Sequence, residues 1–377
     1  MRSSKLPLLR SLALALVGAS LSAPLSPALA EKLLSRDDTT INLGALLQPQ
    51  AVVAQDAAPD GGAGTDFFLR RARLMLHGDL SKRISFFVDT EQVNLGKDGN
   101  WETSIYVQDA YASLRLTPEA SPGAFLDAGM MLVPFTRHSM QSAVSLNALD
   151  YHGRLILYPS QSTRVWRDVG VQGRATLGPV QLRAGVFNGV EGSAGDGNAV
   201  MAKNPGDLPR LAGHARVALL GEEKGFFYPG IQFTDDPVLS IGVGVDWQRQ
   251  AIAMAGMDKA ANHLALAADV YLHLPTGPDQ ALVAQATAVR YDDGDVAAST
   301  GYGGFVEAGF RFGKFEPIVS FERFNSDQTA GDLTAFHLGG AAFLDQHRTN
   351  LKLDVARTRA GATTATWSAT LQGQLSF

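Results

Sequence analysis

The sequence predicts an all-β protein: a transmembrane antiparallel β-barrel of about sixteen strands. Three observations lead to this prediction. Apolar and polar residues alternate along most of the chain, the connections between these alternating segments are short and long in turn, and the last segment is an amphipathic strand that ends on an aromatic residue. After the first thirty positions no stretch of about eighteen apolar residues occurs, so the sequence offers no transmembrane helix.

The N-terminal segment has the pattern of an export signal. Three basic residues, Arg2, Lys5 and Arg10, precede an apolar core at 12–17, and Ala28-Leu29-Ala30 fits a small-x-small cleavage site. A membrane anchor is the alternative, but the apolar run is too short for a spanning helix of about twenty residues. The sequence therefore predicts a cleaved signal peptide at 1–30 and a barrel at 31–377, exported to the bacterial outer membrane.

Composition narrows the chemistry. Removing the three basic residues of the signal changes the formal net charge from −5 to −8 (−5 − 3). A mildly acidic chain argues against a nucleic-acid partner, and any anion site must therefore be local. The absence of cysteine excludes thiol catalysis, cysteine metal sites and disulfides.

The alternating segments define the predicted strands. Most are about nine to thirteen residues long, which is above the soluble mode and matches the length that a tilted strand needs to cross a bilayer. They lie near 41–48, 68–79, 84–89, 109–116, 124–133, 168–174, 181–186, 210–219, 239–247, 263–273, 279–292, 302–313, 315–325, 333–343, 347–358 and 364–377.

The connections follow the parity of outer-membrane barrels, which have short turns at one rim and longer loops at the other. Short turns are predicted at 80–81, 118–122, 178–179, 275–278, 313–314 and 344–346. Longer connections are predicted at 56–66, 94–102, 134–165, 189–209, 250–261 and 293–301. The connection at 221–237 breaks this alternation, and the sequence provides no reason for it.

The C-terminal strand alternates from Ala365 to Phe377, and the chain ends on that aromatic residue. Such a strand resembles the signal read by the bacterial barrel-assembly machinery, which is therefore a predicted partner. In lipid every backbone polar group must be paired, and only a closed barrel removes the edges of a sheet. Sixteen strands leave an aqueous channel, so the geometry predicts passive transport.

The connection at 134–165 is unusually long and basic. Between Pro134 and Arg174 five arginines stand against only Asp150 and Asp168. Loops of this length are usually functional or disordered. This loop follows the fifth predicted strand, so we expect it to be the third external loop, folded inward to form a constriction.

Four segments carry a family resemblance. They are Phe68-Leu69-Arg70-Arg71-Ala72-Arg73-Leu74, Asp109-Ala110-Tyr111, Val133-Pro134-Phe135-Thr136, and Arg167-Asp168-Val169-Gly170-Val171 with Val186-Phe187-Asn188-Gly189. In spacing and order they resemble the phosphate-selective porin O and P family. The resemblance implies a trimeric, sixteen-stranded, anion-preferring porin with an inward third loop. His138 departs from the family, which often has an acidic residue there.

An anion in a narrow pore must exchange water for other donors, and the planar fork of arginine donates two parallel bonds to oxygens. The predicted anion-binding and pore-lining residues are Arg71, Arg73, Arg83, Arg115, Arg137, Arg154, Arg164, Arg174 and Arg216. The alternative is that wall arginines pair with acidic residues of neighbouring strands, Asp79, Asp89, Asp109, Asp127 and Asp168.

The predicted function is a passive outer-membrane diffusion channel that prefers small anions such as phosphate or polyphosphate. The alternatives are a general porin without anion preference and a plugged barrel with an enzymatic or structural role. Outer-membrane lipid and further copies of the chain, in a homotrimer, are the other predicted partners. No catalytic set, cofactor or metal site is predicted, because His263, His273 and His337 form no ligand pattern and no helix follows Gly301-Tyr302-Gly303-Gly304.

Overall fold

The computed structural model describes residues 31–118, 123–153, 166–192, 203–223, 225–253, 259–295 and 297–377. The predicted signal peptide at 1–30 and two predicted site residues, Arg154 and Arg164, lie outside the described residues.

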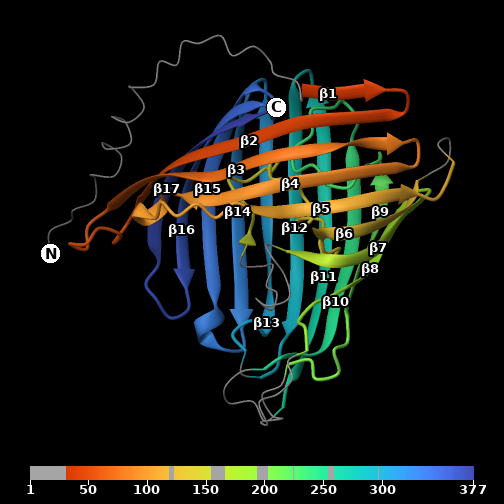
Figure 1. The fold of residues 1–377 in the computed structure, drawn as a ribbon. Coiled ribbons are helices and arrows are strands. Elements are labelled where there is room, and N and C mark those ends of the chain that lie inside the picture. Colours follow the sequence, from red (N-terminus) through yellow and green to blue (C-terminus); the bar gives the residue numbers. More distant parts are fainter. Residues whose placement is uncertain are drawn as a thin grey trace.

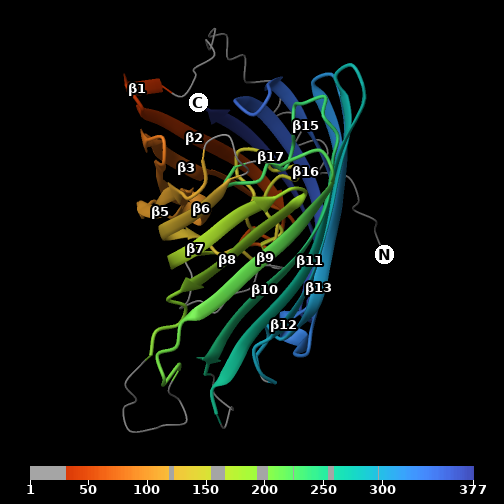
Figure 2. The same ribbon diagram turned by 90° about the vertical axis from the view of Figure 1, so that its right-hand side faces the viewer.

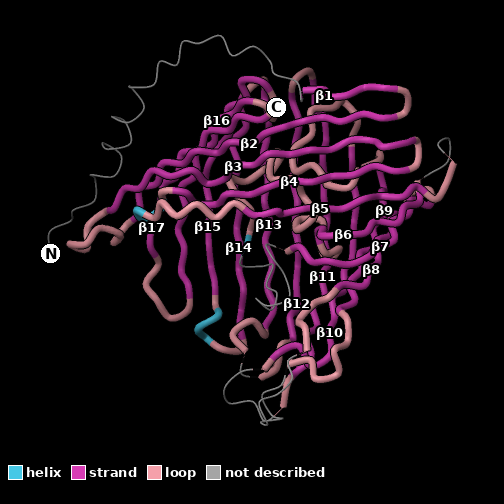
Figure 3. The backbone as a smooth tube through the Cα atoms, viewed as in Figure 1, coloured by secondary structure: helices cyan, strands magenta, loops and turns pink. Residues whose placement is uncertain are grey.

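The described chain is almost entirely strands and their connections, with two short 3-10 turns at Lys97–Gly99 and Thr329–Gly331 (Figures 1 and 3). The strands are β1 Glu31–Arg36, β2 Thr39–Ala54, β3 Gly64–Ser81, β4 Ile84–Leu95, β5 Tyr106–Arg115, β6 Ala124–Leu132, β7 Arg167–Leu177, β8 Val180–Phe187, β9 Arg210–Leu220, β10 Val238–Ile252, β11 Ala261–Gly277, β12 Gln280–Asp292, β13 Gly301–Phe312, β14 Phe315–Ser326, β15 Leu333–Asp345, β16 Thr349–Ala360 and β17 Thr366–Ser376.

Strands β2 to β17 form a closed antiparallel barrel (Figure 2). Each strand pairs with its neighbours in sequence, and β17 pairs with β2 in a register that sets Leu371 opposite Ala51. The last residue completes the seam, since the backbone of Phe377 exchanges hydrogen bonds of 3.0 and 3.1 Å with that of Ala45. The prediction of a sixteen-stranded barrel is confirmed, and closure leaves no unpaired edge inside lipid.

Strand β1 is a feature that the sequence did not predict. It pairs antiparallel with the first residues of β2, from Thr39 to Leu43. Strand β17 reaches only Leu46 on the same strand, so β1 covers the part of β2 that extends beyond the seam. An exposed strand edge is a template for unwanted pairing, and β1 protects it.

The two faces of the wall have opposite polarity. Large apolar side chains face outward, such as Leu74 and Val243, each 60% exposed. Polar side chains at alternate positions are buried on the inside, such as Asp109 and Gln172. This inversion is expected for a wall between lipid and a polar lumen. No helix in the described part of the chain is long and apolar enough to cross a membrane.

Connections alternate between the two rims because neighbouring strands are antiparallel. At one end, the short-turn rim, two or three residues join most strands: 82–83, 178–179, 278–279, 313–314 and 346–348. The connection 221–237 joins β9 to β10 at this same rim and is the long exception. Strands β3 and β11 extend to Ser81 and Gly277, so the predicted turns at 80–81 and 275–278 lie one or more residues later in the structure.

Candidate functional site: two connections inside the barrel

Residues 133–153, which follow β6, contact inward-facing side chains on opposite parts of the wall. The Lys352 ammonium of β16 donates to the carbonyl oxygens of Leu146 and Ala148, at 2.5 and 2.8 Å. The backbone N–H of Arg137 donates to Asp269 of β11 at 3.0 Å. These contacts place the segment across the inside of the barrel rather than along one strand.

An ion-pair cluster ties this segment to β3. Asp150 accepts hydrogen bonds from Arg70 at 2.7 Å and from Arg71 at 2.5 Å, and Arg71 also donates to Gln48 at 2.9 Å. Burial alone would raise the pKa of Asp150, but the positive charges of Arg71 and Arg70 hold it well below its ordinary value. Asp150 is therefore a permanent anion that offsets part of the positive charge of this arginine pair.

A histidine and two glutamates tie the same segment to β13 and β14. His152 lies 3.0 Å from Glu307 and 3.0 Å from Glu322, and its ring stacks on Phe305 with centroids 4.1 Å apart. Burial lowers the pKa of His152, but hydrogen bonds to both carboxylates outweigh it and raise the pKa from 6.5 to about 9. His152 is thus a cation at neutral pH.

The neighbouring His138 behaves in the opposite way. Its Nε2 accepts the backbone N–H of His152 at 3.0 Å, and its Nδ1 lies 3.1 Å from Gln141. Burial and the positive charge of His152 lower its pKa to about 3, so it stays neutral. One ring supplies charge and the other supplies hydrogen bonds.

The connection 221–237 enters the barrel from the short-turn rim and meets the first segment. Tyr228 donates its backbone N–H to Met140 and accepts one from Ser142, both at 3.0 Å, and Ile231 donates to Ser145 at 2.7 Å. Segments 133–153 and 221–237 therefore pair with each other inside the barrel, although they arrive from opposite rims.

Glu223 of this second connection is surrounded by donors. Its Oε1 accepts Nε of Arg137 at 3.2 Å and is also paired with the Nη2 group of Arg137. Its Oε2 accepts the Ser240 hydroxyl at 3.1 Å and forms an ion pair with Arg216. The side chain is 0% exposed, and the Arg137 guanidinium lies 3.4 Å from the centroid of the Tyr271 ring.

Backbone carbonyls of the same connection accept hydrogen bonds from a further arginine. Arg183 donates to Phe226 at 2.7 Å and to Gly225 at 3.2 Å. The Phe226 ring stacks on Tyr111 with centroids 4.2 Å apart, and Phe227 meets Phe87 edge-on at 5.2 Å. Aromatic packing and hydrogen bonds together fix the connection against β4, β5 and β8.

The structure brings only some of the predicted site residues together. Arg137 and Arg216 both contact Glu223, whereas Arg71 and its neighbour Arg73 pair with Asp150 and Glu91. Arg174 pairs with Asp127 at 2.5 Å on the wall. Arg115 donates to the carbonyl oxygens of Thr117 and Pro118 at 3.2 Å, at the end of β5. Arg83 lies in the turn after β3 rather than on a strand and is exposed.

Several residues of the site were not singled out from the sequence. They are Glu223, Ser240 and Lys352, and none of them belongs to a recognisable motif. The one available signal was the break in loop parity at 221–237, which marked the connection but not its path. Within the described part of the chain, no group of three His, Asp or Glu side chains is arranged to hold a metal ion.

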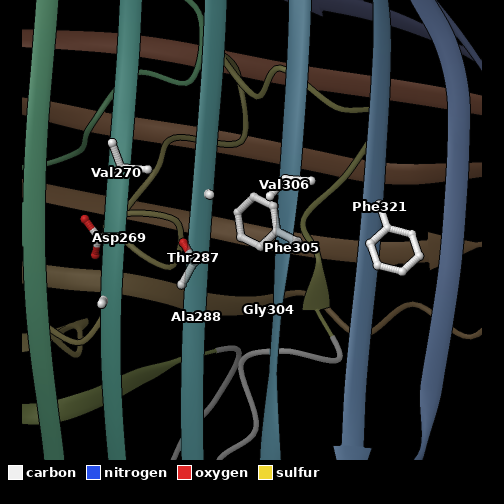
Figure 4. Close-up of a pocket in the computed structure, with 10 residues that line it drawn as sticks. Asp269, Val270, Thr287, Ala288, Gly304, Phe305, Val306 and Phe321 are labelled. Carbon is white, nitrogen blue, oxygen red and sulfur yellow. The ribbon is translucent and has the colours of Figure 1, made fainter.

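A separate hollow of about 450 Å³ lies in the wall between β11 and β14. Figure 4 shows three of its larger lining side chains, Val270, Val306 and Phe321, on separate strands, and Ala288 and Gly304 also line it. The three larger side chains are outward-facing and 37 to 55% exposed. An outward-facing apolar band is typical of a barrel wall, so this hollow is separate from the interior site.

Part of the chain matches a known protein family in sequence. Residues 44–221 match the family described as "Phosphate-selective porin O and P". The first half of the barrel therefore has the sequence pattern of an outer-membrane porin family. The matched region contains the first eight barrel strands and the segment 133–153, and all four segments that carried the resemblance lie in the described part of it.

Solved structures agree with this chain in fold. The outer membrane channel DcaP of Acinetobacter baumannii is 13% identical, with a TM-score of 0.57 over 91% of this chain and 99% of that one. The anion-selective porin from Comamonas acidovorans is 13% identical, with a TM-score of 0.56 over 90% and 100%. The trimer form of OmpT from Vibrio cholerae is 11% identical, with a TM-score of 0.54 over 90% and 100%. No curated protein sequence matches the chain significantly.

Proposed function

We propose that this porin is a passive diffusion channel that prefers anions, with phosphate or polyphosphate as its solutes. The observation that carries the proposal is the meeting of Arg137, Arg183 and Arg216 inside the barrel, around Glu223 and Tyr228. Arginine presents paired donors to oxyanions and stays charged at every physiological pH. The name of the matched family and the anion-selective relative support the same reading.

The proposed constriction is the third external loop, 134–165, together with the connection 221–237. Its proposed anion contacts are Arg137 and Arg216 in the centre, with Arg154 and Arg164 from the remainder of the loop. On the wall they are Arg71, Arg73, Arg115 and Arg174, whereas Arg83 lies in an exposed turn and is not among them. Aspartate and glutamate partners reduce the net charge of these wall arginines, so we expect a moderate anion preference rather than an absolute one.

The assembly pathway is part of the same proposal. We infer a signal peptide cleaved after residue 30, recognition of the strand ending in Phe377 by the barrel-assembly machinery, and a homotrimer in the membrane. The trimer form of OmpT supports the last of these. The exposed apolar outer face supports contact with outer-membrane lipid.

Planar bilayer recording of the purified porin tests the solute class. In a potassium chloride gradient the reversal potential should favour chloride, and millimolar phosphate should reduce the chloride current. Changing Arg137, Arg154 and Arg164 to alanine should weaken both effects, whereas Arg83→Ala, in an exposed turn, should leave them nearly unchanged. Cation selectivity without phosphate block would contradict the anion preference and leave a general porin.

A plugged barrel is a second candidate, favoured by the hydrogen bonds that join segments 133–153 and 221–237 inside the barrel. It predicts no steady conductance after reconstitution. The same recordings therefore separate the two candidates, and an enzymatic barrel would additionally lose an activity when one interior Ser or His is replaced.

A further inference from the structure

We propose that Arg137, Arg216 and Ser240 form an oxyanion-binding site, and that the carboxylate of Glu223 occupies it as a tethered competitor of permeating anions. The inference rests on the proposed anion preference and adds a regulatory element to it. The tether is the connection 221–237, the one long connection at a rim where the other described turns are short.

The contacts of Glu223 are those that a free oxyanion would need. One carboxylate oxygen accepts hydrogen bonds from both Nε and Nη2 of Arg137, the edge of the guanidinium that can also donate two parallel bonds to an oxyanion. The other oxygen accepts the Ser240 hydroxyl at 3.1 Å and pairs with Arg216. Two cations and a neutral hydroxyl thus converge on one anion, a set that suits a phosphate at least as well as a carboxylate.

The three donors belong to the barrel and to segment 133–153, not to the tether. Arg216 is on β9 and Ser240 is on β10, while the backbone N–H of Arg137 is held by Asp269 of β11 at 3.0 Å. Arg137 also stacks on Tyr271. Arg137 also donates to Gln285 at 3.4 Å, so its guanidinium keeps contacts outside the tether. A donor held in this way binds a ligand with less ordering of its own side chain.

The backbone near Glu223 is shaped to bring its side chain inward. Gly221 has a positive φ of 61°, and a Cβ there would lie 2.2 Å from the carbonyl oxygen of Pro237. Gly225, two positions after Glu223, has a φ of 99°. Glycine adopts such angles without steric cost, so the chain turns in and out around the glutamate.

A tethered ligand competes at a high effective concentration, which is millimolar or more for short tethers. The concentration of an external oxyanion must therefore exceed the effective concentration of the Glu223 carboxylate before the oxyanion binds the two arginines. The alternative is a purely structural role, in which Glu223 only offsets the charge of two buried cations. The two hypotheses predict different results when the charge of Glu223 is removed. If Glu223 competes with permeating anions, its removal strengthens anion binding; if Glu223 only stabilises the fold, its removal only lowers the stability of the protein.

The test uses the full-length porin in planar bilayers with inorganic phosphate as the probe. In Glu223→Gln, which preserves the shape of the side chain, we expect the phosphate concentration that halves the chloride current to fall about tenfold, equivalent to about 1.4 kcal/mol. The chloride-over-potassium preference should rise as well. Glu222→Gln, the same change on the exposed neighbouring residue, should do neither. Adding Arg137→Ala to Glu223→Gln should abolish the gain.

An unchanged half-blocking concentration in correctly folded, heat-modifiable Glu223→Gln would overturn the proposal. If that variant does not fold, Glu223→Asp is the second variant, since it keeps the charge but shortens the side chain by one methylene. We expect its half-blocking phosphate concentration to be about threefold lower than that of the wild type. An unchanged half-blocking concentration in Glu223→Asp would overturn the proposal as well. Failure of the anion preference itself is separate, because it appears as cation selectivity of the wild-type channel before any substitution.

Discussion

Replacing His152 by glutamine should loosen the segment 133–153 in a way that depends on pH. The imidazolium of His152 lies 3.0 Å from both Glu307 and Glu322, with its side chain 4% exposed. These carboxylates raise its pKa from 6.5 to about 9. Since the pKa is higher when the segment is docked, the stabilisation is complete below pH 6.5 and is lost as the pH rises through about 9.

The magnitude follows from these two pKa values. Linkage gives a contribution of about 2.6 kcal/mol near pH 7 and almost none near pH 10. The difference corresponds to roughly a 70-fold change in the equilibrium between docked and detached segment. Glutamine keeps some hydrogen bonds but carries no proton to lose, so its contribution should be constant over this range.

Amide hydrogen exchange of peptides from 137–153 measures this opening. The ratio of variant to wild-type exchange rates at each pH cancels the base catalysis of exchange itself, and it also cancels the titration of other groups that both proteins share. We expect the ratio to be near 70 at about pH 7 and to approach one at about pH 10. A ratio that stays constant with pH would refute the assignment of the proton to His152.

Three further predictions address the same interior and the seam. Asp150→Asn should leave Arg70 and Arg71 without the Asp150 carboxylate and shift the reversal potential toward anions. It should also lower the stability of the docked segment by about 1–3 kcal/mol, less than the loss expected for a fully buried ion pair, because Asp150 is 25% exposed. An unchanged reversal potential would argue against a position of this pair on the permeation path. Lys352→Met removes an ammonium that donates to carbonyls of Leu146 and Ala148, so open-channel current noise should increase, while Lys314→Met in an exposed turn should not change it. Deleting Phe377 removes the two backbone hydrogen bonds to Ala45, and the heat-modifiable fraction in outer membranes should fall several-fold, whereas Phe377→Tyr should assemble normally.

The strands were predictable because each obeys a local rule. A wall between lipid and a polar lumen imposes a period of two on every strand, and this pattern is readable in one chain without knowledge of its partners. The register at the seam follows the same rule, since Ala369 and Leu371 of the last strand meet Val53 and Ala51 of β2. Strand β1 escaped prediction because it covers an edge near the rim and has no alternation.

The interior was predictable only in part. Sequence showed that 134–165 is long and basic, and that 221–237 breaks the parity of the rims. It could not show that Arg137 from one would meet Glu223 from the other, or that both would be held against β9 and β10. The contacts of a connection depend on the course of its backbone through the barrel. No repeating pattern of apolar and polar residues in the sequence determines that course.

By itself, then, the sequence determined the class of fold, the alternation of side chains along the strands, and the presence of an unusual basic loop. Tertiary structure alone decided which arginines are compensated and by what. Arg71 and Arg73 share a face of β3, as their spacing requires, yet one pairs with Asp150 of segment 133–153 and the other with Glu91 of the next strand. Charge compensation acts over a few ångströms in space, and residues that are 79 positions apart in the chain become neighbours only when the barrel has closed.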